Sequence, residues 1–155
     1  MVFFFGLLVG IGLAAAVFVT LLRERMLAVT ASRFATVEET VAALEQGIAA
    51  ADGWSSPGTR DLNGMLAKNG VTFAPKVRLV EMCKARYAAE VLQDARAMAT
   101  LMPCALAVYA DDAGKVWISR LNSGLMAKVF GGTVARVMGG GVAVEEERIL
   151  HALKG

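Results

Sequence analysis

The first 22 residues of this 155-residue chain carry no charged side chain, and this run constrains the fold more than any other feature of the sequence. From Val2 to Leu22, only Thr20 has a polar side chain. A helix of about 20 apolar residues crosses the hydrocarbon core of a bilayer, so the run is just long enough for one membrane-spanning helix. We therefore expect residues 1–23 to form a transmembrane anchor and residues 24–155 to form one soluble domain.

A cleaved signal peptide is the alternative for this run. Such a peptide begins with basic residues, but none precedes Val2, and the apolar run continues past the small residues Ala14–Ala16. Both observations favour a retained helix. Arg23, Arg25 and Arg33 follow the run, and basic residues near a span favour the cytoplasmic side. We expect a single-pass protein of the cell inner membrane with its domain in the cytoplasm; a periplasmic domain is the alternative.

Small residues recur every four positions in this helix, at Gly6, Gly10 and Ala14. They share one helix face, and small residues at this spacing allow a second membrane helix to approach closely. The alternative is that Gly and Ala are simply common in membrane helices. The pattern leaves open whether the anchor packs only against lipid or also against a protein.

The composition and motifs of the remaining chain exclude several function classes. The net charge is only +2 and acids and bases are interspersed, whereas nucleic-acid binding requires clustered Lys and Arg. No P-loop, G-x-S-x-G or H-E-x-x-H pattern is present, and His151 is the only histidine. The sequence does not decide whether the domain is an enzyme, but the missing motifs weigh against one.

The soluble part alternates between helical and strand patterns. Thr36 and Glu39 form a capping box that predicts a helix start. Strand-like residues fill 77–83, with a helical pattern from Ala85. The runs 104–110 and 115–121 flank a loop that ends in Gly114, which predicts a β-hairpin. These patterns predict an α+β domain.

Two cysteines, Cys83 and Cys104, are the most distinctive candidates for chemistry. Cys83 ends a predicted strand and Cys104 begins the hairpin, and in a small antiparallel sheet those two ends can lie side by side. Soft sulfur ligands, including Met126 nearby, suit Cu(I) or haem iron. Two buried thiols acting as small hydrophobes are the alternative, and a disulfide becomes the natural state if the domain is exported.

The C-terminal half resembles a known family. Met102-Pro103-Cys104, then 108–109 and 112–119, and then Asn122, 124–126 and 130–132 carry the resemblance. They look like the membrane-anchored, cysteine-containing branch of the domain of unknown function 302 family. The resemblance covers roughly residues 27–150. It implies a two-layer α/β sandwich with a mainly antiparallel sheet, a prokaryotic source and pairing of soluble domains, but no established activity.

The resemblance also draws attention to one set of residues. Cys83, Cys104, Asn122 and Met126 fall on or beside its recognisable segments, so we expect them to form a ligand site, with the two cysteines and Met126 as metal ligands. In such relatives a basic residue commonly follows the second cysteine; Ala105 stands there here, which leaves any polar role of that position in doubt.

Two functions follow as expectations. In the first, the domain binds a small ligand, a soft metal or haem at the membrane surface. In the second, the protein is an accessory subunit of a larger membrane complex, docked through its transmembrane helix. The expected partners are membrane lipid and either a second copy or other membrane subunits, with no nucleic acid.

Overall fold

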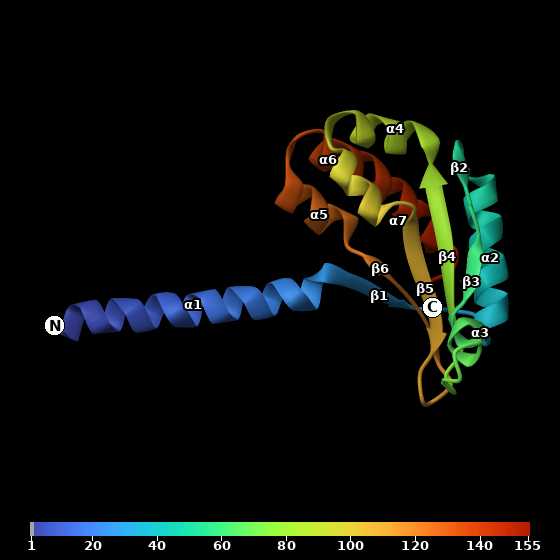
Figure 1. Cartoon of the computed structure of the whole chain (residues 1–155), viewed down its shortest axis with the longest axis horizontal. Coiled ribbons are helices and arrows are strands. Elements are labelled where there is room, and N and C mark those ends of the chain that lie inside the picture. The colour runs from blue at the N-terminus through green and yellow to red at the C-terminus, as the bar shows by residue number, and fades with distance from the viewer. Residues whose placement is uncertain (1) are drawn as a thin grey trace.

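The computed structural model describes residues 2–155, except for the side chains of residues 2–9 and 15. The chain forms an α+β fold in which a six-stranded, antiparallel sheet is packed with helices (Figure 1). The strands are β1 (Leu27–Ala31), β2 (Trp54–Ser55), β3 (Thr59–Asp61), β4 (Val77–Lys84), β5 (Cys104–Ala110) and β6 (Val116–Leu121). The helices of the domain are α2 (Val37–Ala50), α3 (Leu62–Ala67), α4 (Ala85–Asp94), α5 (Ser123–Phe130), α6 (Gly132–Ala135) and α7 (Ala143–His151).

The sheet is built around the predicted hairpin, which the structure confirms. Strand order is β1-β6-β5-β4-β2, and β3 also pairs with β4. One carboxylate organises the hairpin loop, because Asp111 Oδ1 accepts hydrogen bonds from the amides of Ala113 (3.0 Å) and Lys115 (2.9 Å). Its second oxygen accepts from Trp117 Nε1 at 2.8 Å. Gly114 has φ +80°, a conformation that side-chain-bearing residues rarely adopt. Contacts among residues 111–117 therefore stabilise the turn of this hairpin.

The two faces of the sheet have different surroundings, as strand alternation requires. Residues directly opposite one another share a face, so the register Val108↔Ile118 and Val80↔Leu106 defines the inner face, where these residues are fully or almost fully buried. Helices α2 and α7 pack on this side; α7 is seen behind the strands in Figure 1. On the opposite face, side chains of β1, β5 and β6 remain partly exposed. The core therefore lies between the sheet and one helical layer.

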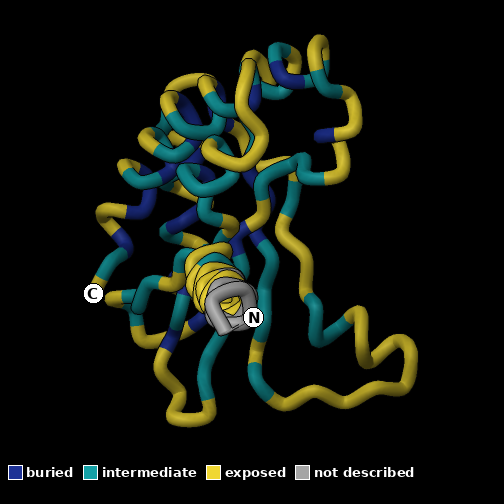
Figure 2. Tube along the Cα trace, turned by 90° about the vertical axis from the view of Figure 1, so that its left-hand side faces the viewer, coloured by how far each residue is buried: buried dark blue, intermediate teal, exposed yellow. Residues whose placement is uncertain are grey.

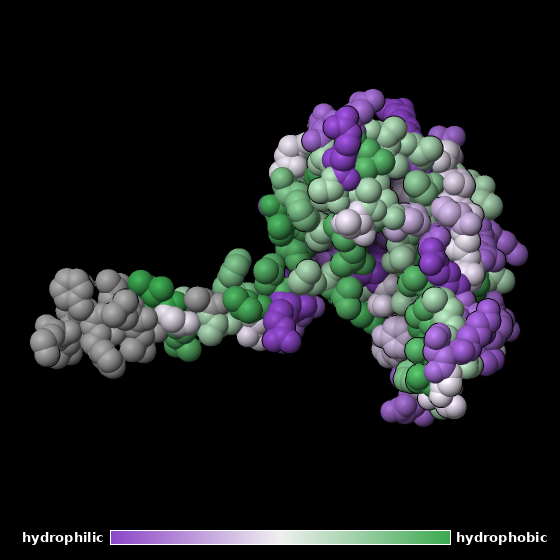
Figure 3. Space-filling view, in the orientation of Figure 1, coloured by the Kyte–Doolittle hydropathy of each residue, from purple (hydrophilic) through white to green (hydrophobic). Residues whose placement is uncertain are grey.

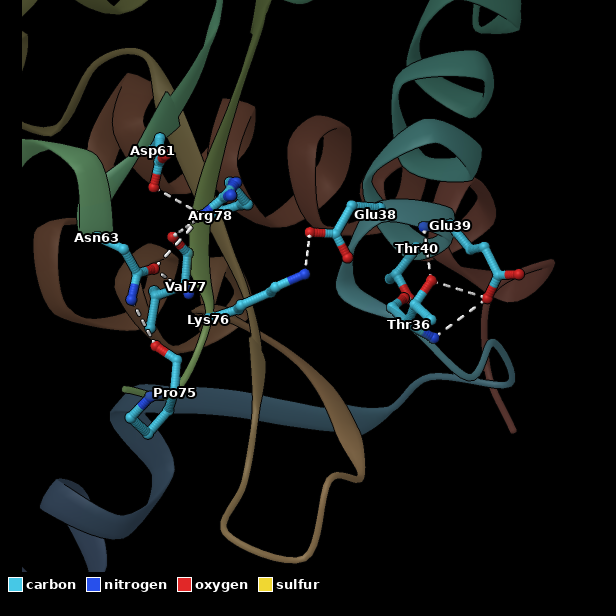
Figure 4. A network of polar contacts seen from close by, with 10 residues as sticks. All are labelled: Thr36, Glu38, Glu39, Thr40, Asp61, Asn63, Pro75, Lys76, Val77 and Arg78. Carbon is cyan, nitrogen blue, oxygen red and sulfur yellow. Dashed lines mark hydrogen bonds and ion pairs between the residues drawn. The ribbon is translucent and has the colours of Figure 1, made fainter. Parts of the chain in front are cut away.

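Helix α2 begins where its capping box predicts. Thr36 Oγ1 accepts a hydrogen bond from the Glu39 amide at 3.2 Å, and Glu39 Oε2 accepts from the Thr36 amide at 3.1 Å (Figure 4). Leu44 and Ile48, one helical turn apart, are fully buried against the sheet. Helix α2 ends at Ala50, and Gly53 lies in the turn before β2.

The connection between α3 and β4 is held by side chains (Figure 4). The amide group of Asn63 donates to the carbonyls of Phe73 (2.8 Å) and Pro75 (2.7 Å), and its oxygen accepts from the Val77 amide at 2.7 Å. Arg78 pairs with Asp61 at 2.7 Å. These contacts set where β4 starts, and β4 leads to the candidate site at its other end.

Helix α1 (Val2–Met26) extends away from the domain (Figure 1). Its described residues are exposed except for the half-buried Leu22, as the view along the helix shows (Figure 2). Arg23 and Arg25 lie in its last turn, where the helix joins the domain. Among the residues that the structure describes, no helix is both long and apolar enough to cross a membrane. The side chains of residues 1–9, nearly half of the predicted anchor, lie outside the described residues.

Candidate functional site

The sheet register brings the two cysteines together at one end of neighbouring strands. Met82 lies directly opposite Cys104, so Cys83 is one residue away from the opposing position. Opposite Cα atoms in such a ladder lie about 4.5–5.5 Å apart and successive ones about 3.8 Å, which places the Cα atoms of Cys83 and Cys104 within about 9 Å. Both residues are half-buried free thiols. Side chains alternate along a strand, so Cys104 shares a face of the sheet with Met82, whereas Cys83 lies on the opposite face at the end of β4.

A small pocket lies at this end of the sheet, and both cysteines line it. Its volume is about 40 Å³. Four methionines from four parts of the chain also line it, so that six sulfur-bearing residues line one cavity: Met82, Met98, Met102, Met138 and the two cysteines. The rest of the wall is mainly aliphatic. A volume of this size accepts one ion or a water molecule or two rather than an organic molecule.

Burial keeps the Cys104 thiol protonated. Burial, with smaller contributions from the nearby carboxylate of Glu146 and from Cys83, raises the pKa of Cys104 to about 11. A thiolate is the reactive form of cysteine, so Cys104 is a poor nucleophile at neutral pH. A metal ion that bound here would have to displace its proton, as metal ions do at thiol sites.

A polar cluster closes the rim of this pocket around one carboxylate. Glu145 accepts hydrogen bonds from three side chains: Trp54 Nε1 at 2.6 Å, Lys84 Nζ at 2.8 Å and the Tyr87 hydroxyl at 2.6 Å. Lys84, followed by Tyr87, lowers the pKa of Glu145 to about 2. The carboxylate in turn raises the pKa of Lys84 and of Tyr87 through the same hydrogen bonds.

Close helix packing makes this cluster possible. The π-helical segment η2 (Arg136–Val142) precedes α7, and Gly141 within it faces the ring of Tyr87. A Cβ atom at position 141 would lie 2.7 Å from Tyr87 Cζ, which is too close for any real contact. Glycine therefore lets Tyr87 sit where its hydroxyl reaches Glu145.

A second, larger pocket adjoins the first. Its volume is about 310 Å³, and Leu101, Pro103, Cys104 and Met138 line both pockets. Met126 lines this second pocket and is not among the residues lining the first. Met126, on α5, therefore lies beside the second pocket, and its expected place at one centre with both cysteines stays a prediction. Of the two cysteines, Cys104 lines the same pocket as Met126 and Cys83 does not.

A buried ion pair forms the polar part of the second pocket. Arg120 Nη1 lies 2.9 Å from Glu146 Oε2, with side-chain exposures of 12% and 3%. The Ser123 hydroxyl is 3.2 Å from the same carboxylate oxygen, and Arg120 also reaches Glu147 at 2.8 Å. Burial raises the pKa of Glu146, and Arg120 opposes this shift. Burying these two charged side chains therefore carries a desolvation penalty, which their mutual attraction offsets.

Asn122 has a different role from the expected one. It is the N-cap of α5, where its side-chain oxygen accepts from the Leu125 amide at 3.0 Å. Its amide group donates to the Arg25 carbonyl at 3.1 Å, and its backbone amide donates to the Met26 carbonyl at 2.9 Å. Asn122 lines neither pocket. Asn122 therefore connects the start of α5 to the last turn of α1.

The predicted helix-packing face is only partly described. Gly10 and Ala14 are exposed, and nothing lies within 4 Å of a Cβ atom built at Gly10. Gly6 lies outside the described residues. Within the described part of the chain, no group of three or more His, Cys, Asp or Glu side chains could hold a metal ion. Any metal at the cysteines would therefore need methionine sulfur as well.

Sequence reasoning missed the Glu145 cluster. Trp54 lies 91 residues away from Glu145 along the chain. No local spacing links these residues. The one signal was their chemistry: an indole, a phenol and a lysine are donors that seek an acceptor when half-buried.

Comparison with known proteins agrees with the fold. The model of the family described as "Domain of unknown function DUF302" matches residues 28–153. Among solved structures, the crystal structure of an uncharacterized conserved protein DUF302 from Bacillus stearothermophilus is similar, with a TM-score of 0.72 and 17% sequence identity. The match covers 83% of this chain and 98% of that one. No curated protein matches the chain.

Proposed function

The chain belongs to the DUF302 family, and from this premise we propose that it is a membrane-anchored module that binds a single soft metal ion in the small pocket lined by Cys83 and Cys104. The family itself carries no assigned activity, so the proposal rests on the chemistry of the site. The observation that carries it is that six sulfur-bearing residues line one cavity.

Ligand type selects the metal. Thiolate and thioether sulfur are soft ligands that favour Cu(I) over hard cations. Zinc sites in proteins are built from four Cys, His or carboxylate ligands, and only the two cysteines of this pocket belong to that set. Cys104 would be the anionic ligand, and Met82, Met102 or Met138, which line the same pocket, would supply neutral thioether sulfur. Cu(I) is therefore the ion that this donor set fits.

Pocket size narrows the choice between a metal ion and haem. A volume of about 40 Å³ holds an ion, whereas organic ligands occupy pockets of about 300–1,000 Å³. Haem therefore does not fit between the cysteines. The protonated state of Cys104 adds a testable property, because binding must release its proton and should strengthen as pH rises.

The membrane anchor is part of the same proposal. It is supported by the uncharged run from Val2 to Leu22, by helix α1 over that run and by the exposure of its described side chains. Arg23 and Arg25 at the end of the helix favour a cytoplasmic domain at the inner membrane. In that arrangement the site would receive its ion from the cytoplasm.

Metal titration of the full chain in mild detergent tests this function. Under anaerobic, reducing conditions we expect one equivalent of Cu(I) to resist a competing chelator, and we expect a Cys83→Ser, Cys104→Ser protein to lose it. Met102→Leu should weaken binding. Met65→Leu is the matched control, because Met65 is 49% exposed on α3 and lines neither of these pockets. Equal retention of Cu(I) by the double variant would overturn the proposal.

The second candidate is an accessory subunit of a membrane complex. It is favoured by the open surroundings of Gly10 on α1, since small residues on a membrane helix allow close contact with another helix. The same purification separates the two candidates. Other subunits present in fixed proportion, in a preparation without bound copper, would support this second function, and a homodimer would appear as a doubled mass.

A further inference from the structure

The end of helix α5 exposes two large apolar side chains next to each other. Val129 is 61% exposed and Phe130 is 48% exposed. Lys128 precedes them, and Gly131 and Gly132 follow, all three on the surface. Single exposed apolar residues are ordinary, but an adjacent pair at a helix end, without polar side chains after it, is a compact apolar tip.

The start of α5 is fixed to the end of α1. Asn122 caps α5 and bonds to the carbonyls of Arg25 and Met26 in the last turn of α1, at 3.1 and 2.9 Å. The two helices are also in direct contact. Whatever surface the end of α1 meets, the beginning of α5 therefore lies beside it.

The direction of α5 completes the geometry. The helix runs from the sheet toward the side of the domain from which α1 extends, and its end lies level with the last turns of α1 (Figure 1). The hydropathy surface shows hydrophobic residues gathered on this side of the domain, with a hydrophilic group where the long helix joins it (Figure 3). Arg23 and Arg25 are exposed in that last turn.

We propose that Val129 and Phe130 insert into the interfacial layer of the same bilayer that α1 crosses, so that the domain is held at two points. This inference rests on the proposed membrane anchor. If α1 spans the bilayer up to Leu22, its basic last turn lies among the lipid headgroups, and the tip of α5 lies at the same depth. Apolar side chains flanked by lysine or arginine are typical of helices that bind at this boundary. Lys128 can extend its charge to the phosphates while its stem stays in the apolar layer.

Two attachment points have a consequence for the site. A single helix leaves a domain free to turn about its axis, whereas a second contact fixes which side faces the lipid. The larger pocket is lined by Leu27, just after α1, and by Met126 on α5. This pocket would then lie close to the headgroups.

Fluorescence quenching by brominated lipids tests the contact in the full chain. The Phe130→Trp protein would be reconstituted into vesicles with and without bromine on the acyl chains. Its matched control is Phe73→Trp, because Phe73 is also 48% exposed but lies in the loop after α3, on the side of the domain away from α1. The wild type gives the background from Trp54 and Trp117.

We expect the emission added at position 130 to be quenched by brominated lipid and shifted to the blue, and the emission added at position 73 to be unchanged. Equal behaviour at both positions, in a protein that resists alkaline extraction from the vesicles, would overturn the contact and leave the anchor standing. Release of the wild type by alkaline carbonate would overturn the anchor, and the contact with it.

Discussion

Replacing Arg120 by methionine should show how much folding stability is lost when one partner of the buried ion pair is removed. Arg120 lies on β6 and Glu146 on α7, 2.9 Å apart, and the carboxylate side chain is only 3% exposed. Methionine has a similar length and no charge, so the substitution leaves Glu146 with the Ser123 hydroxyl as its remaining donor at 3.2 Å. Removing one partner of a buried pair typically costs about 3–5 kcal/mol, because the other charge is left uncompensated.

The loss should depend on pH in a defined direction. Burial already raises the pKa of Glu146 in the folded protein, and Arg120 opposes that shift. Without Arg120, the pKa should rise further above its unfolded value of about 4.3. Between those two values the folded state holds a proton that the unfolded state has lost, so stability falls as pH rises through this window. The variant should therefore be weakest at neutral pH and partly recover as pH falls toward the unfolded pKa.

Denaturant unfolding of the full chain in mild detergent measures both effects. A second substitution, Glu146→Leu, should restore most of the loss, because an apolar pair can replace a buried ion pair at little cost. Arg136→Met is the matched control, since its pair with Glu90 is largely exposed and should contribute about 0–1 kcal/mol. A loss below about 1 kcal/mol for Arg120→Met, or a loss that does not change between about pH 5 and pH 8, would refute the reasoning.

Three further substitutions test the fold and the rim of the small pocket by unfolding measurements. Ile118→Ala should cost about 2–5 kcal/mol because the side chain is 2% exposed, and the exposed Val71→Ala should cost a few tenths at most. Thr36→Ala should cost about 1 kcal/mol because the Glu39 amide loses its acceptor, and an unchanged stability would mean that the cap contributes nothing. Glu145→Gln should cost about 1–2 kcal/mol at neutral pH, because the carboxylate is a quarter exposed and its folded pKa is about 2. That contribution is present above the unfolded pKa and is lost as pH falls through about 2, so an equal loss at pH 7 and pH 2 would contradict it.

The elements that the sequence predicted well are those closed by local chemistry. The capping box at Thr36 needs only residues within one helical turn, and the hairpin loop at Asp111 needs only the next six residues. The strand-like runs 104–110 and 115–121 also predicted both strands of the hairpin, which the pairing of β5 with β6 confirms. In each case the interacting groups are neighbours along the chain.

The parts that the sequence predicted poorly depend on contacts between distant segments. Met126 was grouped with the cysteines because it follows the hairpin closely, but the direction of α5 places it beside the second pocket. Met98 was not considered at all, and yet the 3₁₀ helix η1 (Arg96–Leu101) brings it to the small pocket. The direction in which a short helix leaves a strand is set by tertiary packing rather than by spacing.

Asn122 shows how a recognisable segment can be important without touching a ligand. It stands between β6 and α5, and it bonds backward to α1 and forward to Leu125. A residue that satisfies backbone groups of two helices at once cannot be replaced by an apolar one without leaving those groups bare. The proposed second membrane contact depends on the same joint, because Asn122 sets where α5 begins relative to α1. Asn122, which the sequence grouped with a ligand site, therefore holds the start of α5 against the last turn of α1.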